Sequence, residues 1–396
     1  MSINIIVQGS SRSWSGSPDN CMNLVENFPV VYWTLKKLVE NFPKAKIVLA
    51  APLFDKNGPF SKIVKKFNGR VDVYFGNNNS PLLRMIDAHS KFFKNETYFL
   101  RIDSLNMFVK PEDLKQMHSL AVKDSLDCFK FPDDYPVQFT ADIYKIDALV
   151  KMRDMIPANS PFVIHPKYFI MTNSSFRHGV YSKGKLSKKY LIDVRRKAKN
   201  IYLERGDMSH QSVEGGDQLS FHYTLALPYI KKSNNVLDVA CGTGFGLTRL
   251  AERSNEVCGA DISKKVINTA GHRVKHLSNI KLIVADVTNL PFGDETFDVI
   301  TSFETLEHVD ADLYKKELWR VLKAGGLLIV STPQNNVGAY PVNSNHIREY
   351  SLEEFKCLFD DLFEIEKIIG IKQGTIFFKD DSYGNNTFAV LKKRSL

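Results

Sequence analysis

The chain has 396 residues, 43% of them hydrophobic and 24% charged, which is ordinary for a folded protein and long enough for two or three domains. No apolar run approaches about 18 residues, and the first strand lacks a basic flank and a cleavage site, so we expect neither a membrane span nor a signal peptide. Five scattered cysteines without C-x-x-C spacing predict reduced core residues in a cytoplasmic protein and argue against structural zinc.

The first 178 residues alternate between short apolar runs and amphipathic stretches. Alternation of this kind predicts a largely parallel sheet with helices on both faces. We expect strands at 3–7, 46–50, 71–75 and 98–102, and helices at 30–39, 59–67 and 82–93.

The order of short motifs in this half resembles the cytidylyltransferase-like family of nucleotide-sugar enzymes, especially the spore-coat-polysaccharide type. The resemblance implies a nucleotide-diphospho-sugar-transferase-like domain over residues 1–178. It rests on a loop rich in glycine and hydroxyl residues at 8–12 and on the helix predicted at 29–34. Two short motifs, one ending in glycine at 73–76 and a Leu-x-Arg at 82–84, also match, as do the segments at 101–102 and 111–113 that frame the expected metal acid.

This half also departs from the family in the charged groups that nucleotidyl transfer needs. After Arg12 there is no lysine until Lys36, although such a transfer relies on cations to neutralise a triphosphate. The family's first metal-binding acid falls on Leu105, two residues from Asp103, whereas Asp142 matches the second. We therefore favour a degenerate, binding-only domain and assign Asp103 and Asp142 to a metal only if the domain is active.

A basic join, predicted as a linker over 179–205, separates the two halves. Residues 183–199 hold eight Lys or Arg and one Asp, and 186–202 is predicted to be an amphipathic helix. The net charge of +9 would suit nucleic acid, a membrane surface or an anionic sugar nucleotide. Because the charge is so local, a solvated linker helix is the better interpretation, and we do not expect nucleic acid as a partner.

A glycine-rich loop follows the first buried strand of the second half. Residues 236–246 form a short apolar run with an acid, three glycines within five residues, and then a helical pattern. The order is G-x-G-x-G, with Leu247 where a dinucleotide loop has its third glycine. Asp238 would repel a phosphate but attract the positive charges of S-adenosylmethionine. A glycine turn in an arbitrary doubly wound sheet is the alternative.

Three further acids, Asp261, Asp286 and Glu304, follow apolar runs at intervals of one strand and one helix. From Val236 to about Leu391 the chain resembles the class I S-adenosylmethionine-dependent methyltransferases, in the branch called type 11. The resemblance implies a Rossmann-like domain over 206–396 with S-adenosylmethionine as cofactor. The cofactor-binding residues that it implies are Asp238, Ala240, Gly242, Thr243, Gly244, Asp261, Ile262, Asp286, Val287, Phe303 and Glu304.

The run Glu304–Val309 is the best local source of a catalytic base. It resembles the Glu-x-x-Glu-His run of this branch, where the His can serve as a base or the acids can hold a metal. We assign catalysis to His308 and Glu307 and expect no metal. The alternative is that Glu304 lines the cofactor site while Glu307 and His308 cap the next helix.

Two other segments are candidates for ligand contacts. His346, Arg348 and Tyr350 resemble a segment near the substrate of type 11 enzymes from glycan clusters, although Arg348 may equally form a surface salt bridge. His222 and Tyr223, in the helix before the first strand, would either touch ligand or belong to the core.

We therefore predict two Rossmann-like doubly wound domains and a methyltransferase acting on a sugar, sugar nucleotide or surface-glycan precursor. The N-terminal domain would bind that small-molecule substrate. The alternatives are a bifunctional nucleotidyltransferase–methyltransferase and a non-catalytic nucleotide-binding assembly protein. The sequence indicates no oligomeric state.

Overall fold

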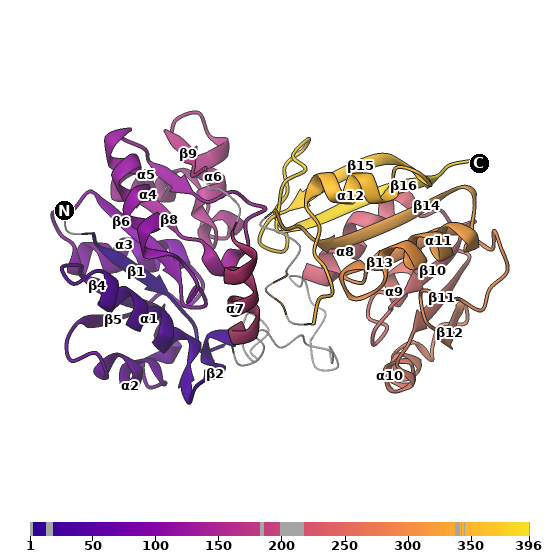
Figure 1. Ribbon diagram of the computed structural model, residues 1–396, viewed down its shortest axis with the longest axis horizontal. Helices are drawn as coiled ribbons and strands as arrows, with labels where there is room; N and C mark the ends of the chain where they lie inside the picture. Colours follow the sequence, from indigo (N-terminus) through magenta and orange to yellow (C-terminus); the bar gives the residue numbers. More distant parts are fainter. Residues whose placement is uncertain are drawn as a thin grey trace. The chain divides into compact units, whose positions relative to one another are not determined.

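The chain divides into two compact units, each built around its own seven-stranded sheet (Figure 1). The computed structural model describes residues 3–12, 19–182, 186–198, 218–336, 341, 343 and 345–395. The N-terminal unit comprises Met1–Gly184 with Arg196–Leu203, and the C-terminal unit comprises Lys185–Arg195 with Glu204–Leu396. The division falls within helix α7 (Lys188–Ala198) of the basic join, between Arg195 and Arg196.

The N-terminal sheet has the order β5-β4-β1-β6-β8-β7-β9. Its strands are β1 (Ile5–Gln8), β4 (Ile47–Pro52), β5 (Val71–Gly76), β6 (Tyr98–Asp103), β7 (Cys128–Lys130), β8 (Asp142–Lys145) and β9 (His178–Val180). The first four run parallel, as predicted, and β8 is antiparallel to both β6 and β7. A short hairpin, β2 (Leu24–Val25) with β3 (Phe28–Pro29), stands apart from this sheet.

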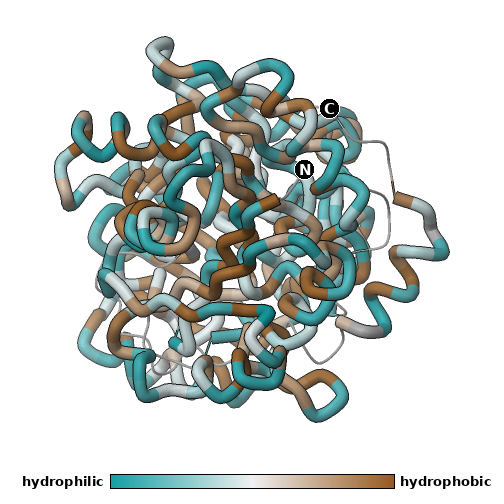
Figure 2. The backbone as a smooth tube through the Cα atoms, turned by 90° about the vertical axis from the view of Figure 1, so that its left-hand side faces the viewer, coloured by the Kyte–Doolittle hydropathy of each residue, from teal (hydrophilic) through white to brown (hydrophobic). Residues whose placement is uncertain are grey.

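The helices of this unit begin where local chemistry favours a start. Ser80 caps α3 by accepting the Leu83 N–H, and Pro81 occupies the first helical position, where its missing N–H costs nothing. The helices are α1 (Val30–Asn41), α2 (Phe60–Lys65), α3 (Pro81–Phe92), α4 (Pro111–Lys123), α5 (Ile146–Met155) and α6 (Pro166–Thr172). All three predicted helices and all four predicted strands are confirmed to within a few residues. Figure 2, which faces this unit, shows hydrophobic segments running through the interior and hydrophilic segments on outer turns.

The C-terminal sheet has the order β12-β11-β10-β13-β14-β16-β15. Its strands are β10 (Asn235–Val239), β11 (Glu256–Asp261), β12 (Ile280–Val284), β13 (Phe297–Phe303), β14 (Leu322–Pro333), β15 (Phe363–Ile371) and β16 (Asn386–Lys393). The first five are parallel, and β16 is antiparallel to both of its neighbours. Strand order reverses between β10 and β13, and in open α/β sheets ligands bind at the carboxyl ends of the strands at such a point.

Hydrophobic cores cover both faces of this sheet. One core packs under α8 (Gln218–Ala226), α9 (Leu247–Ala251) and α10 (Lys264–Val274), and the other under α11 (Ala311–Val321) and α12 (Leu352–Phe359). Ser351 and Glu354 form a capping box at the start of α12, which satisfies backbone donors at both positions.

Two details of the C-terminal elements depart from a simple alternation of helix, turn and strand. β14 begins at Leu322, directly after α11, and pairs there with Phe297. Gly325, with φ +69°, accommodates the shift of register that follows this pair. The third strand ends at Val284, so Asp286 lies beyond it, where its carboxylate accepts hydrogen bonds from the backbone N–H and the hydroxyl of Thr288.

Candidate active site

The loop after β10 has an unusual backbone conformation. Ala240, Gly242 and Gly244 have φ of 52°, 55° and 77°, in the left-handed region where side chains other than glycine are strained. A Cβ on Gly244 would press against Ala270, whereas one on Gly242 would meet nothing within 4 Å. The loop is therefore fixed on its inner side and open at Gly242, which suits close approach of a ligand to its backbone.

Asp261, the last residue of β11, binds this loop directly. One carboxylate oxygen accepts the Gly242 N–H at 3.1 Å, and the other accepts the Ser263 N–H at 2.9 Å. Ile262 beside it is 71% exposed, an unusual position for a large apolar side chain. A half-buried carboxylate next to an exposed apolar surface is what an adenosine ribose and base would require.

Asp238 lies beneath the loop. Its carboxyl group is 1% exposed and accepts hydrogen bonds from the hydroxyls of Tyr223 at 2.8 Å and Thr301 at 2.6 Å. Burial raises the pKa of Asp238 to about 7, although the two hydrogen bonds favour its ionised form. Asp238 would therefore attract a positively charged cofactor from beneath the loop, and it would do so only when its carboxyl group is ionised.

Tyr223 belongs to the core and supports the loop from α8. Its ring is buried and packs edge-on against Phe245 and Phe303. His222 is buried as well, with its Nδ1 3.0 Å from the Ser331 hydroxyl. Of the two predictions for these residues, the structure supports the core position.

The close contact of Tyr223 with Gly246 gives a first testable prediction. A Cβ on Gly246 would lie inside the Tyr223 ring, although the backbone φ of −78° would suit alanine. Gly246→Ala should therefore lower the free energy of unfolding by about 1–3 kcal/mol through overpacking and weaken ligand binding at the loop. The control is Gly271→Ala, in α10, where a Cβ makes only ordinary contact at 3.7 Å. Chemical denaturation should separate the two variants, and equal stabilities would contradict this role of Tyr223.

Thr243 tests whether the loop fits a ligand. Its hydroxyl is buried and has no hydrogen-bond partner among the described residues. Buried polar groups are nearly always paired, so a buried hydroxyl in a glycine loop that has no partner in the described part of the chain would suit a hydrogen bond to a bound ligand. The loop, Asp261 and Ile262 together fit a nucleoside with a polar substituent.

The end of β13 holds Glu304 in a fixed orientation. Its φ of 51° is again left-handed, and its two oxygens accept hydrogen bonds from the Ser331 hydroxyl at 2.9 Å and the Asn386 amide at 2.7 Å. Burial raises its pKa to about 7. Because Ser331 and Asn386 come from β14 and β16, sequence spacing could not have revealed these partners.

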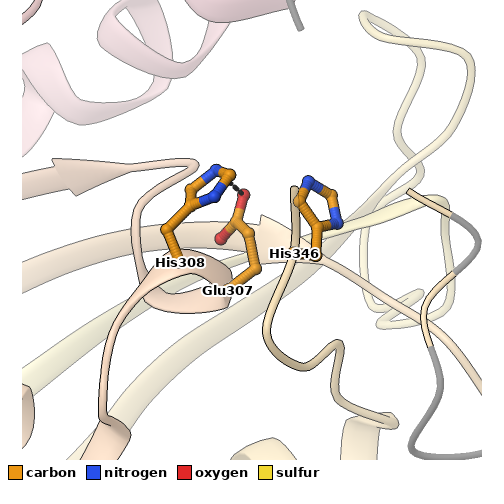
Figure 3. A group of neighbouring side chains, drawn as sticks. All are labelled: Glu307, His308 and His346. Atoms are coloured by element: carbon orange, nitrogen blue, oxygen red, sulfur yellow. Dashed lines mark ion pairs between the residues drawn. The ribbon is translucent and has the colours of Figure 1, made fainter. Parts of the chain in front are cut away.

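Glu307, His308 and His346 come together beyond β13 (Figure 3). The first two lie in the 3-10 helix η6 (Leu306–His308), with His308 Nε2 3.9 Å from Glu307 Oε1. The rings of His308 and His346 are 5.0 Å apart and nearly perpendicular. Each of the three residues offers a ligand atom within 4.8 Å of the others. In the described part of the chain, this is the one such group of His, Cys, Asp or Glu.

Neighbouring groups orient each member of this cluster. Thr332 donates its hydroxyl to Glu307, which is 1% exposed, and burial together with nearby Glu304 raises the pKa of Glu307 well above its usual range. His308 Nδ1 lies 3.2 Å from the Asn345 carbonyl oxygen. The backbone N–H of Ile347 donates to the Glu307 carbonyl at 2.7 Å, which joins the two segments.

Glu349 is a site residue that the sequence did not reveal. One of its oxygens lies 2.6 Å from His346 Nδ1, and the other accepts a hydrogen bond from the Asn335 amide at 2.7 Å. The signal available was the spacing of three residues between His346 and Glu349, which many surface turns share.

The other residues predicted near the substrate lie elsewhere. Arg348 forms an ion pair with Glu354 at 2.8 Å and lies over the Tyr350 ring, on the exposed side of the segment. Tyr350 is 5% exposed and belongs to a hydrophobic core. Of the three predicted residues, only His346 joins the cluster.

In the N-terminal unit, the candidate metal acids are engaged in ion pairs. Arg101 lies between them, 3.2 Å from Asp103 and 3.6 Å from Asp142, and Lys167 lies 3.3 Å from Asp142. Asp142 is 3% exposed, so two cations already neutralise it in the interior. This arrangement gives the N-terminal unit a partly buried polar centre in which two cations face two carboxylates.

Residues 237–330 match the family model described as a methyltransferase domain. This part of the chain is a methyltransferase domain. The match covers β10, β11, β12 and β13, the glycine loop and the Glu307–His308 pair, and it includes no residue of the N-terminal unit.

Curated relatives carry methyltransferase names. A "Probable S-adenosylmethionine-dependent methyltransferase" from Mycolicibacterium smegmatis is 30% identical over 146 residues, which are 35% of this chain and 56% of that protein. Demethylmenaquinone methyltransferases from Staphylococcus haemolyticus and Geobacillus are 36% and 40% identical over 105 and 106 residues, about a quarter of this chain and 44% and 45% of those proteins. The chain thus spans about half the length of the curated relatives it matches.

Among solved structures, the PH0226 protein from Pyrococcus horikoshii is similar over 46% of this chain and 94% of its own, with 22% identity and a TM-score of 0.37. Within the described ranges, no helix combines the length and the apolar character needed to cross a membrane.

Proposed function

We propose that the protein transfers a methyl group from S-adenosylmethionine to a hydroxyl of a small sugar or sugar-nucleotide acceptor. The observation that supports this most is the placement of the glycine loop, Asp261 and Glu304 at the carboxyl ends of three neighbouring parallel strands, within a methyltransferase domain. Such an edge is where an α/β sheet binds nucleotides.

Each residue at this edge of the sheet would contact a different part of the cofactor. Asp261 would accept hydrogen bonds from the ribose hydroxyls, Ile262 would cover the adenine, and the backbone of the loop at Gly242 would approach the ligand closely. Thr243 would gain the hydrogen-bond partner that it lacks within the described chain. When bound, S-adenosylmethionine supplies an electrophilic methyl group on a positively charged sulfur.

A hydroxyl acceptor must lose its proton during methyl transfer, and the Glu307, His308 and His346 cluster is the candidate for that task. The side chain of His308 is 31% exposed and therefore accessible, whereas Glu307 lies buried behind it. The cluster follows β13 directly, as Glu304 does, so cofactor and acceptor would meet at one end of the sheet.

The acceptor class follows from the N-terminal unit rather than from the names of the relatives. Two of the relatives are named for demethylmenaquinone, but this chain matches less than half of their length, so the name does not carry the acceptor over. The N-terminal unit supports a nucleotide-type acceptor, because the parallel strands of its sheet offer the carboxyl-end edge at which such sheets bind nucleotides. Arg101, near the end of β6, lies partly buried at this edge, where it pairs with Asp103 and Asp142.

The test is transfer of a labelled methyl group to a panel of sugar nucleotides, free sugars and an isoprenoid quinol. Labelling of a sugar or sugar nucleotide, removed by Arg101→Gln without loss of cofactor binding, would support the proposal. Labelling of the quinol alone would overturn the sugar acceptor and leave methyl transfer standing.

A second prediction concerns nucleotidyl transfer by the N-terminal unit. With CTP, Mg²⁺ and a panel of sugar acids, we expect no release of pyrophosphate above background, because Arg101 and Lys167 occupy the carboxylate of Asp142 and the first loop lacks a lysine. A Mg²⁺-dependent signal that Asp142→Ala abolishes would instead establish the bifunctional alternative.

A further inference from the structure

We infer that His222 is a positioning residue of the cofactor site, which acts on Glu304 through the hydroxyl of Ser331. His222 Nδ1 lies 3.0 Å from Ser331 Oγ, and the same hydroxyl donates to Glu304 Oε1 at 2.9 Å. These side chains belong to α8, to β14 and to the residue that follows β13, so the contacts join three elements of the C-terminal unit. The inference rests on the proposed function, in which Glu304 lies at the cofactor.

His222 cannot act by touching a ligand itself. Its side chain is 0% exposed, and its ring packs against Phe303 and Phe388 with centroid separations of 5.6 Å and 6.4 Å. Ser331 is fully buried as well. Glu304 is only half-buried, so an effect of His222 on a bound ligand would have to pass through Ser331 to Glu304.

The number of protons available sets the direction of these hydrogen bonds. Serine has one hydroxyl proton and an ionised carboxylate can only accept, so with Glu304 ionised this proton lies between Ser331 and Glu304. His222 must then donate its Nδ1–H to Ser331 Oγ. Burial lowers the pKa of His222 to about 3, so the imidazole is neutral and its Nε2 carries no proton.

The second nitrogen of His222 argues against a purely structural role. Nε2 is buried and has no hydrogen-bond partner among the described residues. An orphaned polar atom in the interior costs free energy, so an apolar side chain would serve packing alone better than an imidazole does. The hydrogen bond to Ser331 is therefore the feature of His222 that needs the imidazole.

Glu304 needs this support because its backbone and its charge are both unfavourable where they lie. Its φ of 51° is left-handed, and burial raises its pKa to about 7. Ser331 and Asn386 offset this by donating to one oxygen each. With His222 donating from behind, the Ser331 hydroxyl cannot turn away, and hydrogen bonds that run in one direction strengthen one another. The arrangement favours one orientation of an ionised Glu304, the form that would attract a positively charged cofactor.

The experiment is a double-substitution cycle in the full-length protein, with the affinity for S-adenosylmethionine measured by calorimetry. His222→Leu should weaken binding by about 3-fold to 10-fold through the loss of one hydrogen bond, and Ser331→Ala by about 10-fold, since its bond is to a charged group. Because His222 acts only through Ser331, the double variant should bind no more weakly than Ser331→Ala alone.

The conservative replacement is His222→Asn, which resembles leucine in size but can donate an amide N–H from near the position of Nδ1. It should bind within about 2-fold of the wild type, as expected when one hydrogen bond is restored. His222→Gln, whose amide reaches the position of Nε2 instead, should behave like His222→Leu and replaces it if the leucine variant does not fold. Ser254→Ala is the matched control, because it removes a buried hydroxyl that donates to the Leu250 carbonyl at 2.8 Å, before the amino end of β11.

Urea denaturation of each variant reports that it is folded. Additive losses in the double variant, or an asparagine variant that binds no better than the leucine or glutamine variant, would show that His222 only packs and would overturn the inference, with the proposed function intact. Native affinity in a folded His222→Leu protein would do the same. Unchanged affinity in Glu304→Gln would instead remove Glu304 from the cofactor site and count against the proposed function as well.

Discussion

Replacing Asp261 with alanine should weaken the binding of S-adenosylmethionine by about 10-fold to 100-fold. The expected loss has two sources. A charged hydrogen-bond acceptor for the ribose disappears, at a cost of about 1.5–3 kcal/mol. The Gly242 and Ser263 N–H groups also lose the carboxylate that shapes the loop. Isothermal titration calorimetry of the folded variant at constant pH measures the change.

Asp298→Ala is the matched control for this experiment. Asp298 lies on β13 at the opposite end of the sheet, where its carboxylate accepts the Asn235 N–H at 2.8 Å and pairs with Lys323. The Asp298→Ala substitution therefore removes a comparable hydrogen bond to a backbone N–H far from the candidate site, and it should leave the affinity for S-adenosylmethionine unchanged. An Asp261→Ala protein that folds and binds with native affinity would remove Asp261 from the site.

The strand ends of the C-terminal unit could be predicted from sequence because two local signals coincide there. A buried parallel strand is a short apolar run, and a ligand-facing edge begins where that run meets a polar residue. Asp261 and Glu304 satisfy both conditions and lie at the ends of β11 and β13. Asp286 satisfies the pattern but lies beyond the strand, because its side chain stabilises a turn with Thr288.

What sequence could not reveal are contacts between side chains far apart in the chain. The meeting of Glu307 and His308 with His346 depends on the path of the segment after β14, which no spacing rule fixes. Likewise, the hydrogen bond from Asn386 to Glu304 exists only because β16 inserts between β14 and β15. That insertion depends on the packing of the whole sheet and has no local signature.

The antiparallel strand β8 illustrates the same limit in the N-terminal unit. Alternating elements predicted a largely parallel sheet, which holds for β1, β4, β5 and β6. Strand β8 runs the other way beside β6, and this brings Asp142 opposite Arg101. The ion pair that argues against a metal at Asp142 is thus a consequence of topology.

The last prediction concerns Asp238, whose ionisation should make the stability of the protein depend on pH. Its pKa is about 7 in the folded protein, against about 3.9 for an aspartate in an unfolded chain. Between these values the folded state holds a proton that the unfolded state has lost. The contribution of Asp238 to the free energy of unfolding is therefore fully present below about pH 4 and declines by about 1.4 kcal/mol per pH unit as the pH rises toward 7.

Asp238→Asn tests this directly, because asparagine has the same shape and stays neutral. Its side chain can still accept a hydrogen bond from one of the two hydroxyls, Tyr223 or Thr301, and donate to the other. We expect urea denaturation to show the variant gaining about 3 kcal/mol relative to the wild type between pH 5 and pH 8. Glu304, whose pKa is also raised to about 7, titrates in both proteins and cancels from the difference. If the two proteins instead showed parallel pH profiles, Asp238 would ionise normally in the fold, and the carboxylate would be available beneath the glycine loop throughout this range.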